Sequence, residues 1–209
     1  MNKNLIVILS CVLVGAYGLG GLFSTFSTPE AKYKTLKTFD GFDVRQYDTM
    51  VWASVQVHDN NRNKAFMSLA NYIWGDNRLP EQPDHSTKIE MTVPVLDHKN
   101  ADKVLFMSFV LPDRYKEVEK TPIPTNPEVK LSAHADKIFA VRRFKGRATE
   151  KRIAEHTKTL LDGIEGEEDV QRKEGSRIYL AQYNPPWEIP FFRRNEIWVE
   201  VDYEEKKLE

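Results

Sequence analysis

Hydrophobic and polar residues alternate along much of the chain with the two-residue period of a half-buried β-strand. Residues 51–57 show this most clearly, because one face consists of Val51, Ala53, Val55 and Val57. An Asp40-Gly41 turn between apolar flanks predicts a β-hairpin over residues 35–47. Five further strands are predicted from their β-branched and aromatic content, at residues 88–95, 104–111, 138–144, 177–183 and 196–201.

Two other segments have the period of an amphipathic helix. The first is capped by Asp59 or Asn60, runs to about Trp74 and stops at Gly75, and its apolar positions are Phe66, Leu69, Ala70 and Ile73. The second covers about residues 149–162, and its inward-facing apolar residues are Ile153, Leu160 and Leu161. Between these elements, residues 76–87 predict a polar loop and residues 112–136 a proline-rich extended connector.

The order strand, helix, strand, strand occurs twice, with Ile178 in the second copy at the place of Ile89 in the first. Two copies are too few to stack as a solenoid. We therefore expect an α+β fold in which two pseudo-repeats join their strands into one antiparallel sheet or distorted barrel, with a helix from each half on the outside.

The N-terminal residues are apolar, and residues 4–29 carry no charged side chain. Lys3, the aliphatic run after it and small residues near Ala16 are typical of a secretory signal cleaved after Ala16, so we expect a secreted protein in the secretory pathway. Residues 5–23 are also about long enough for an uncleaved membrane anchor, and an organellar leader is a third alternative. The chain thus divides into a signal or anchor (residues 1–27), a globular domain (residues 28–203) and a charged tail (residues 204–209).

Composition and charge exclude several function classes. The chain has 30 Lys and Arg against 31 Asp and Glu, a net charge of −1, which argues against nucleic-acid binding. Cys11 is the only cysteine, and the five histidines form no zinc motif, so neither a disulfide nor a metal site is expected. The common catalytic motifs are missing, so we expect no catalytic residues and no enzyme. One basic cluster is interpreted as a solvated face: Arg142, Arg143, Lys145, Arg147, Lys151 and Arg152.

A proline-stiffened segment at residues 184–196 carries large apolar residues followed by two arginines: Trp187, Ile189, Phe191, Phe192, Arg193 and Arg194. Such side chains either line a groove or plug one end of the barrel. A groove of this kind suits a flat apolar ligand with carboxylates, since aromatic rings stack and guanidinium groups bind carboxylates. In the plug alternative, Arg193 or Arg194 pairs with Glu196, and the residues alone leave both alternatives open.

Three segments resemble signatures of the SOUL haem-binding protein family. Residues 88–95 (KIEMTVPV) are similar to its K-I-x-M-T-x-P-V motif. Residues 183–186 (YNPP), followed by residues 193–198 (RRNEIW), are similar to its C-terminal motif, and residues 43–47 (DVRQY) to its E-V-R-x-Y segment. The resemblance extends over about residues 33–202, nearly the whole globular part.

This resemblance implies a distorted antiparallel barrel flanked by two helices, and non-enzymatic, non-covalent binding of haem or another tetrapyrrole. The implied groove is lined by Asn63, Phe66, Met67, Ala70 and Trp74, faced by Trp187 and Phe191, with propionates at Arg193 or Arg194. Gln46 stands where some members have a histidine proposed as iron ligand, and Glu188 near where a relative has lysine. Binding is therefore expected to rest on apolar contact and on arginine pairing instead of an iron ligand. The alternatives are a carrier of another apolar small molecule and a protein-interaction module without one.

Overall fold

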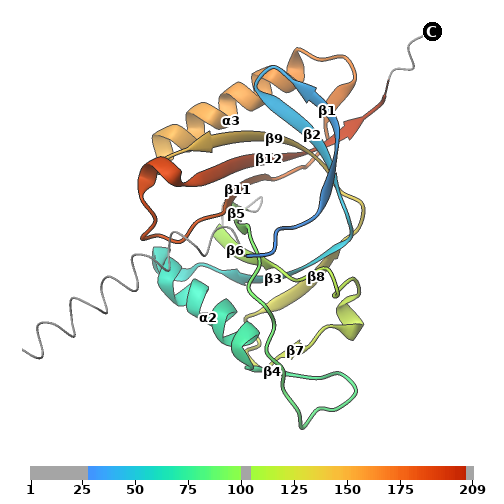
Figure 1. Ribbon diagram of the computed structural model, residues 1–209, viewed down its shortest axis with the longest axis vertical. Helices are drawn as coiled ribbons and strands as arrows, with labels where there is room; N and C mark the ends of the chain where they lie inside the picture. The colour runs from blue at the N-terminus through green and yellow to red at the C-terminus, as the bar shows by residue number, and fades with distance from the viewer. Residues whose placement is uncertain (1–27, 100–104, 206–209) are drawn as a thin grey trace, which may run out of the picture.

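A curled antiparallel sheet with one helix on each of its two halves makes up the fold (Figure 1). The computed structural model describes residues 28–99 and 105–205. The α+β class is confirmed, and the sheet curls into a half-barrel with the two helices outside it. The predicted signal or anchor lies outside the described residues, as do residues 206–209 of the tail.

The main sheet contains ten strands within the described residues: β1 (Tyr33–Phe39), β2 (Phe42–Tyr47), β3 (Met50–Gln56), β5 (Val95–Lys99), β6 (Leu105–Val110), β8 (Lys130–His134), β9 (Ile138–Lys145), β10 (Val170–Arg172), β11 (Ile178–Gln182) and β12 (Arg194–Tyr203). A small second sheet pairs β4 (Asn77–Arg78) with β7 (Ile123–Pro124). The helices are α2 (Arg62–Trp74) and α3 (Glu150–Glu165), and single 3-10 turns form η1 (His58–Asn60), η2 (Val118–Lys120) and η3 (Pro190–Phe192).

The two pseudo-repeats meet at the centre of the sheet and exchange their first strands. The strand order is β1-β2-β9-β12-β11-β5-β6-β3-β8, so the halves join where β11 pairs with β5. Strand β2 precedes β3 in sequence but pairs with β9, and β8 precedes β9 but pairs with β3. Each half therefore supplies the edge of the other, which ties both into one body.

Several predicted boundaries were wrong for identifiable reasons. The strand expected at residues 88–95 begins only at Val95, because Pro94 lacks an N–H and the residues before it bond elsewhere. Val93 accepts from the N–H of Ala31 (3.1 Å) and donates to the carbonyl of Pro29 (2.9 Å). The cap of α2 is Asn61, not Asp59 or Asn60, since the Asn61 side chain accepts the N–H of Lys64.

The predicted connector and second helix also differ. Residues 112–136 are not extended connector throughout, because they include β8, which pairs with β3 at the edge of the sheet. The prolines of this segment lie outside the five paired residues of β8. Helix α3 extends to Glu165, beyond the expected end at residue 162. The short strand β10 was not predicted.

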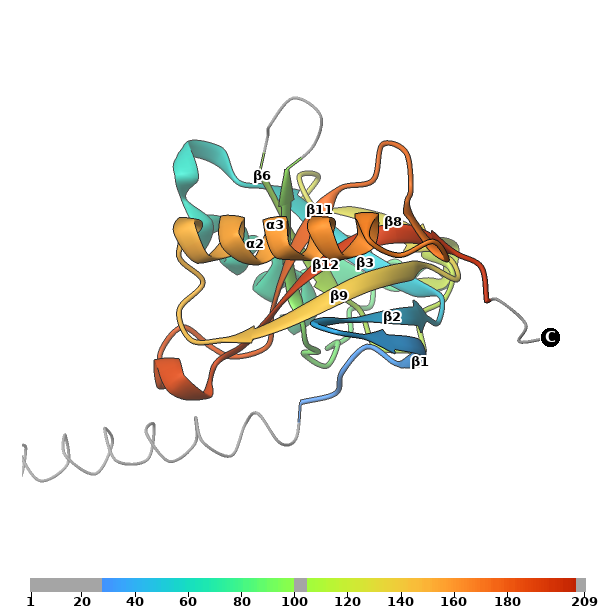
Figure 2. The same ribbon diagram turned by 90° about the horizontal axis from the view of Figure 1, so that it is seen from above.

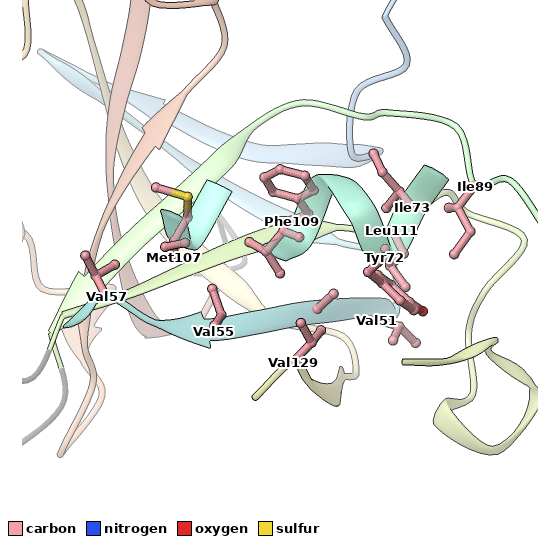
Figure 3. Packing of buried hydrophobic residues seen from close by; sticks show 13 residues of the cluster. Val51, Val55, Val57, Tyr72, Ile73, Ile89, Met107, Phe109, Leu111 and Val129 are labelled. Carbon is pink, nitrogen blue, oxygen red and sulfur yellow. The ribbon is translucent and has the colours of Figure 1, made fainter. Parts of the chain in front are cut away.

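The core lies on both faces of the sheet. On one half α2 packs against β3 and β6, as Figure 3 shows for Tyr72, Ile73 and Phe109 among others. On the other half α3 packs against β9 and β12 around Leu160 and Ile164. A third cluster, which includes Tyr47, Trp52 and Trp198, fills the inside of the half-barrel. No helix in residues 28–99 or 105–205 is long and apolar enough to span a membrane.

Candidate functional site

The loop of residues 184–193, called the aromatic loop below, keeps its large side chains on the surface. The exposed fractions are 74% for Trp187, 51% for Ile189, 70% for Phe191 and 58% for Phe192. The Phe191 ring meets Phe192 edge-on, and the ammonium group of Lys145 lies 5.6 Å from its centroid. These side chains do not fill the barrel, so the loop is not an apolar plug.

Arg193 holds the aromatic loop in its conformation. Its Nε donates to the carbonyl of Glu188 at 2.8 Å, and its Nη2 donates to the carbonyl of Pro186. The carboxylate of Glu188 is turned inward and accepts the N–H of Ile189 at 3.0 Å, so it presents little charge to a ligand. Because its guanidinium group is used on the loop itself, Arg193 acts as a positioning residue.

Helix α2 carries the other predicted contacts. Phe66, Met67 and Trp74 are exposed by 37%, 43% and 58%, and Asn63 is exposed in the first turn. Ala70 is buried in the middle of this stretch. The Phe66 ring leans edge-on against Phe109 of β6, with centroids 5.3 Å apart. The buried stripe of α2 faces the sheet, and a second, partly apolar stripe faces solvent.

Arg62 links the start of α2 to the strand that leads into the aromatic loop. Its guanidinium group donates to the Asp97 carboxylate on β5 and, at 3.2 Å, to the side-chain oxygen of Gln182, the last residue of β11. Within the described ranges, no hydrogen bond, ion pair or ring contact joins α2 to the aromatic loop itself. The two predicted flanks of the groove thus lie on elements that Arg62 connects, and no hydrogen bond, ion pair or ring contact of the described residues joins the flanks directly.

A buried carboxylate, Glu196, organises the inside of the half-barrel near the aromatic loop. It has no exposed surface and accepts hydrogen bonds from Arg45 (3.2 Å), Tyr183 (2.7 Å), Arg194 (2.9 and 3.1 Å) and Trp198 (2.8 Å). Burial by itself would raise the pKa of Glu196, but the guanidinium groups of Arg194 and Arg45 hold it below its usual value. The carboxylate is therefore ionised and fully paired at neutral pH.

Arg194 forms ion pairs with two carboxylates of the domain. Beyond Glu196, it forms an ion pair with Glu30 at 2.9 Å, and its guanidinium carbon lies 3.7 Å from the centre of the Tyr183 ring. The Arg194–Glu196 pair expected in the plug alternative is therefore present, although the loop does not fill the barrel. A ligand carboxylate that approached Arg194 would have to compete with two protein carboxylates.

The sequence motifs meet at this buried cluster, of which only the Arg194–Glu196 pair was among the expectations from sequence. One motif supplies Arg45, another Tyr183, and the last supplies Arg194, Glu196 and Trp198. The KIEMTVPV segment also serves the fold, because Thr92 donates its hydroxyl to the carbonyl of Val110. The two-residue spacing of Glu196 and Trp198 could have indicated the cluster. In a strand this spacing puts the carboxylate on the same face as the large apolar Trp198, which is expected to point inward.

Two clefts lie away from the predicted groove. One, of about 260 Å³, is lined by Glu30, Thr92 and Asp113 among others, and one of about 270 Å³ includes Trp52, His98, His134 and Arg177. Both are smaller than the roughly 300–1,000 Å³ typical of small-molecule sites, so neither encloses a tetrapyrrole. In the second cleft, burial above all lowers the pKa of His98 and of His134 to about 4. The part of the chain that the structure describes contains no group of three His, Cys, Asp or Glu side chains placed to hold a metal ion.

The family model described as SOUL heme-binding protein matches residues 28–200. The chain belongs to the SOUL family. The match spans the globular domain and includes all the motifs that meet around Glu196. Among curated proteins, none matches this sequence at a significant level.

Solved structures with a similar fold are distant in sequence. The C-terminal domain of EcmrR superposes with a TM-score of 0.55 at 9% identity, covering 82% of this chain and 98% of that one. An uncharacterized conserved protein from Listeria innocua superposes with a TM-score of 0.50 at 16% identity, covering 88% and 98%. At such low identity these likenesses concern the fold alone.

Proposed function

We propose that this SOUL-family chain binds haem or another tetrapyrrole non-covalently and without catalysing a reaction. The observation that carries the proposal is the family match over residues 28–200. The place we propose is the outward face of α2, with Trp187 of the aromatic loop at its border. Asn63, Phe66, Met67 and Trp74 form that face, Ala70, which was also predicted to line the groove, is buried beneath it, and Phe191 lies farther along the loop.

The residues of α2 fit the flat apolar part of a tetrapyrrole. Met67 and Trp74 offer a thioether and an indole face on the surface, and Phe66 adds a ring fixed by Phe109. Burying roughly 500 Å² of porphyrin at about 25 cal/mol per Å² contributes on the order of 12 kcal/mol. Association costs of about 4–15 kcal/mol remove much of that, so we expect micromolar affinity.

The charges favour a different propionate partner from the one the sequence suggested. Arg193 is bonded to loop carbonyls and Arg194 to two carboxylates. Lys145 beside Phe191 has no carboxylate of the described residues within 4 Å, so its ammonium group is free to meet a propionate at this end of the domain. In this proposal the propionate forms its ion pair with the ammonium group of Lys145 instead of the guanidinium group of an arginine.

Iron coordination is not required by this proposal. Gln46 lies on β2, paired with Lys34 and Ile138, in the half of the sheet that α3 covers. A neutral amide is a poor haem ligand, so the porphyrin ring supplies most of the contact. Haemin and iron-free protoporphyrin should therefore bind with similar affinity.

The test is a matched titration of the full chain with haemin and with protoporphyrin, following the Soret band and tryptophan fluorescence. Met67→Glu, which adds a negative charge on the proposed face, should weaken both at least tenfold. Ile123→Glu is the control, because Ile123 is exposed by 53% on β7 and receives the same change of charge. Equal effects of the two variants, or no saturable binding of either porphyrin at tens of micromolar, would overturn the proposal.

A further inference from the structure

The aromatic loop exposes more apolar surface than a soluble surface loop normally does. Trp187, Ile189, Phe191 and Phe192 are each more than half exposed within one short segment. Contiguous apolar surface of this kind marks an interaction site, because exposing it to water costs free energy. Tryptophan and phenylalanine are also the side chains that lie at the boundary between lipid headgroups and acyl chains.

Exposed cations without a carboxylate partner lie on β9 and in the turn after it, and β9 pairs with the residues that follow this loop. Arg143, Lys145 and Arg147 are exposed, and none has a carboxylate of the described residues within 4 Å. Lys145 pairs in register with Arg194, directly after the loop, and the N–H of Gly146 donates to the carbonyl of Arg193 at 3.1 Å. The basic cluster, interpreted from sequence as a solvated face, thus extends to the aromatic loop. Near an anionic membrane each such residue contributes about 1 kcal/mol.

The described chain begins beside this surface. The Glu30–Arg194 ion pair fixes the start of the described chain beside the end of the aromatic loop, and Figure 2 shows both along the same edge of the molecule. Thr28 is separated from the apolar run of residues 5–23 by four residues. At about 3.5 Å per residue, the chain between Phe23 and Thr28 can span at most roughly 17 Å.

From these observations we infer that the aromatic loop docks on a lipid bilayer, inserting Trp187, Ile189, Phe191 and Phe192 among the acyl chains near the headgroups. Arg143, Lys145 and Arg147 contact anionic headgroups around it. A protein partner would also accept apolar side chains, but a lipid surface accounts for the aromatic tip, the unpaired cations and the nearby apolar N-terminal run together. Trp187, Phe191 and Lys145 also belong to the proposed porphyrin site, so the docking is tested without porphyrin.

The experiment measures the depth of one tryptophan in a membrane. The full chain is bound to vesicles of phosphatidylcholine and phosphatidylserine, and binding is verified by flotation. In Trp74→Phe, the exposed indole left in the described domain is Trp187, and brominated lipid should reduce its emission at least twofold. In the matched variant Trp187→Phe, the exposed indole is Trp74 on α2, and its emission should stay unchanged. The buried Trp52 and Trp198 give the same background in both.

Charge is tested in the same assay. Lys145→Glu should reduce the quenching of Trp187 severalfold at low salt, whereas Lys158→Glu on α3 applies the same charge change away from the loop and should not. Vesicles of phosphatidylcholine alone should give less quenching than mixed vesicles. Absence of flotation, flotation without quenching of Trp187, or equal quenching of Trp74 would overturn the inference. Equal quenching in the two lysine variants would overturn the role of the basic residues.

Discussion

Replacing Glu196 by glutamine should remove much of the stability of the fold. The wild-type carboxylate accepts hydrogen bonds from two guanidinium groups, a phenol and an indole, all in the interior. Glutamine has one accepting oxygen, and its amide nitrogen would meet donors. Tyr183 can turn its hydroxyl to accept, but the Trp198 indole can only donate. Arg45 and Arg194 would also lose the counter-charge they share.

The expected cost follows from what remains after the change. Arg45 keeps its ion pair with Asp43 at 2.6 Å, and Arg194 keeps Glu30 at 2.9 Å, so neither guanidinium group becomes fully unpaired. Removing one partner of a buried charge pair costs about 3–5 kcal/mol, and we expect a value in this range. Since a domain is stable by only about 5–15 kcal/mol, this is roughly a fifth or more of the total.

The assay is equilibrium unfolding in urea, followed by tryptophan fluorescence at pH 7. The midpoint of Glu196→Gln should fall by roughly 2 M urea, given typical denaturant slopes. The control is Glu200→Gln, because Glu200 pairs with Lys137 and Lys173 nearer the surface and should cost about 1 kcal/mol or less. If Glu196→Gln does not fold, Tyr183→Phe removes a single hydrogen bond to the carboxylate and should cost about 1.5–3 kcal/mol.

Equal midpoints for Glu196→Gln and Glu200→Gln would refute this reasoning, because the buried cluster would then contribute no more than a surface pair.

A series of unfolding measurements at different pH values gives a second check. Because the pKa of Glu196 is lowered in the folded state, its contribution is complete above its usual pKa and is lost as the pH falls through the lowered value. The difference between wild type and Glu196→Gln should therefore shrink only as the pH falls below the usual pKa of a glutamate.

Two further predictions concern the core and the second cleft. Leu69 lies on the buried face of α2 and has no exposed surface, so Leu69→Ala should lower the free energy of unfolding by about 2–5 kcal/mol in urea titrations. A loss below about 1 kcal/mol would contradict the packing of this cluster, part of which Figure 3 shows. For His98 and His134 the folded-state pKa is about 4 against 6.5 for the free side chain, so stability is complete above pH 6.5 and declines down to pH 4. The loss should reach about 3 kcal/mol per histidine, and a double His→Gln variant with the same pH dependence would contradict it.

Much of the architecture followed from local patterns. The alternation of residues 51–57, the Asp40-Gly41 turn and the two helical stripes placed β1, β2, β3, α2 and α3 close to where they occur. These elements depend on near neighbours in sequence, namely which side chains share a face and which residues turn the chain. The motifs at both ends of the globular part likewise identified the family.

The pairing of distant segments was decided only by the tertiary structure. The sequence could not show that β2 pairs with β9 and β8 with β3, since an open strand edge accepts any segment that the fold brings to it. Nor could it show that Arg194 faces Glu30 and Glu196, because a surface arginine and a buried one look the same in a motif. The sequence determined which side chains lie on each strand and helix. The pairing of the two halves determined which of those side chains are used in ion pairs and which stay unpaired on the surface.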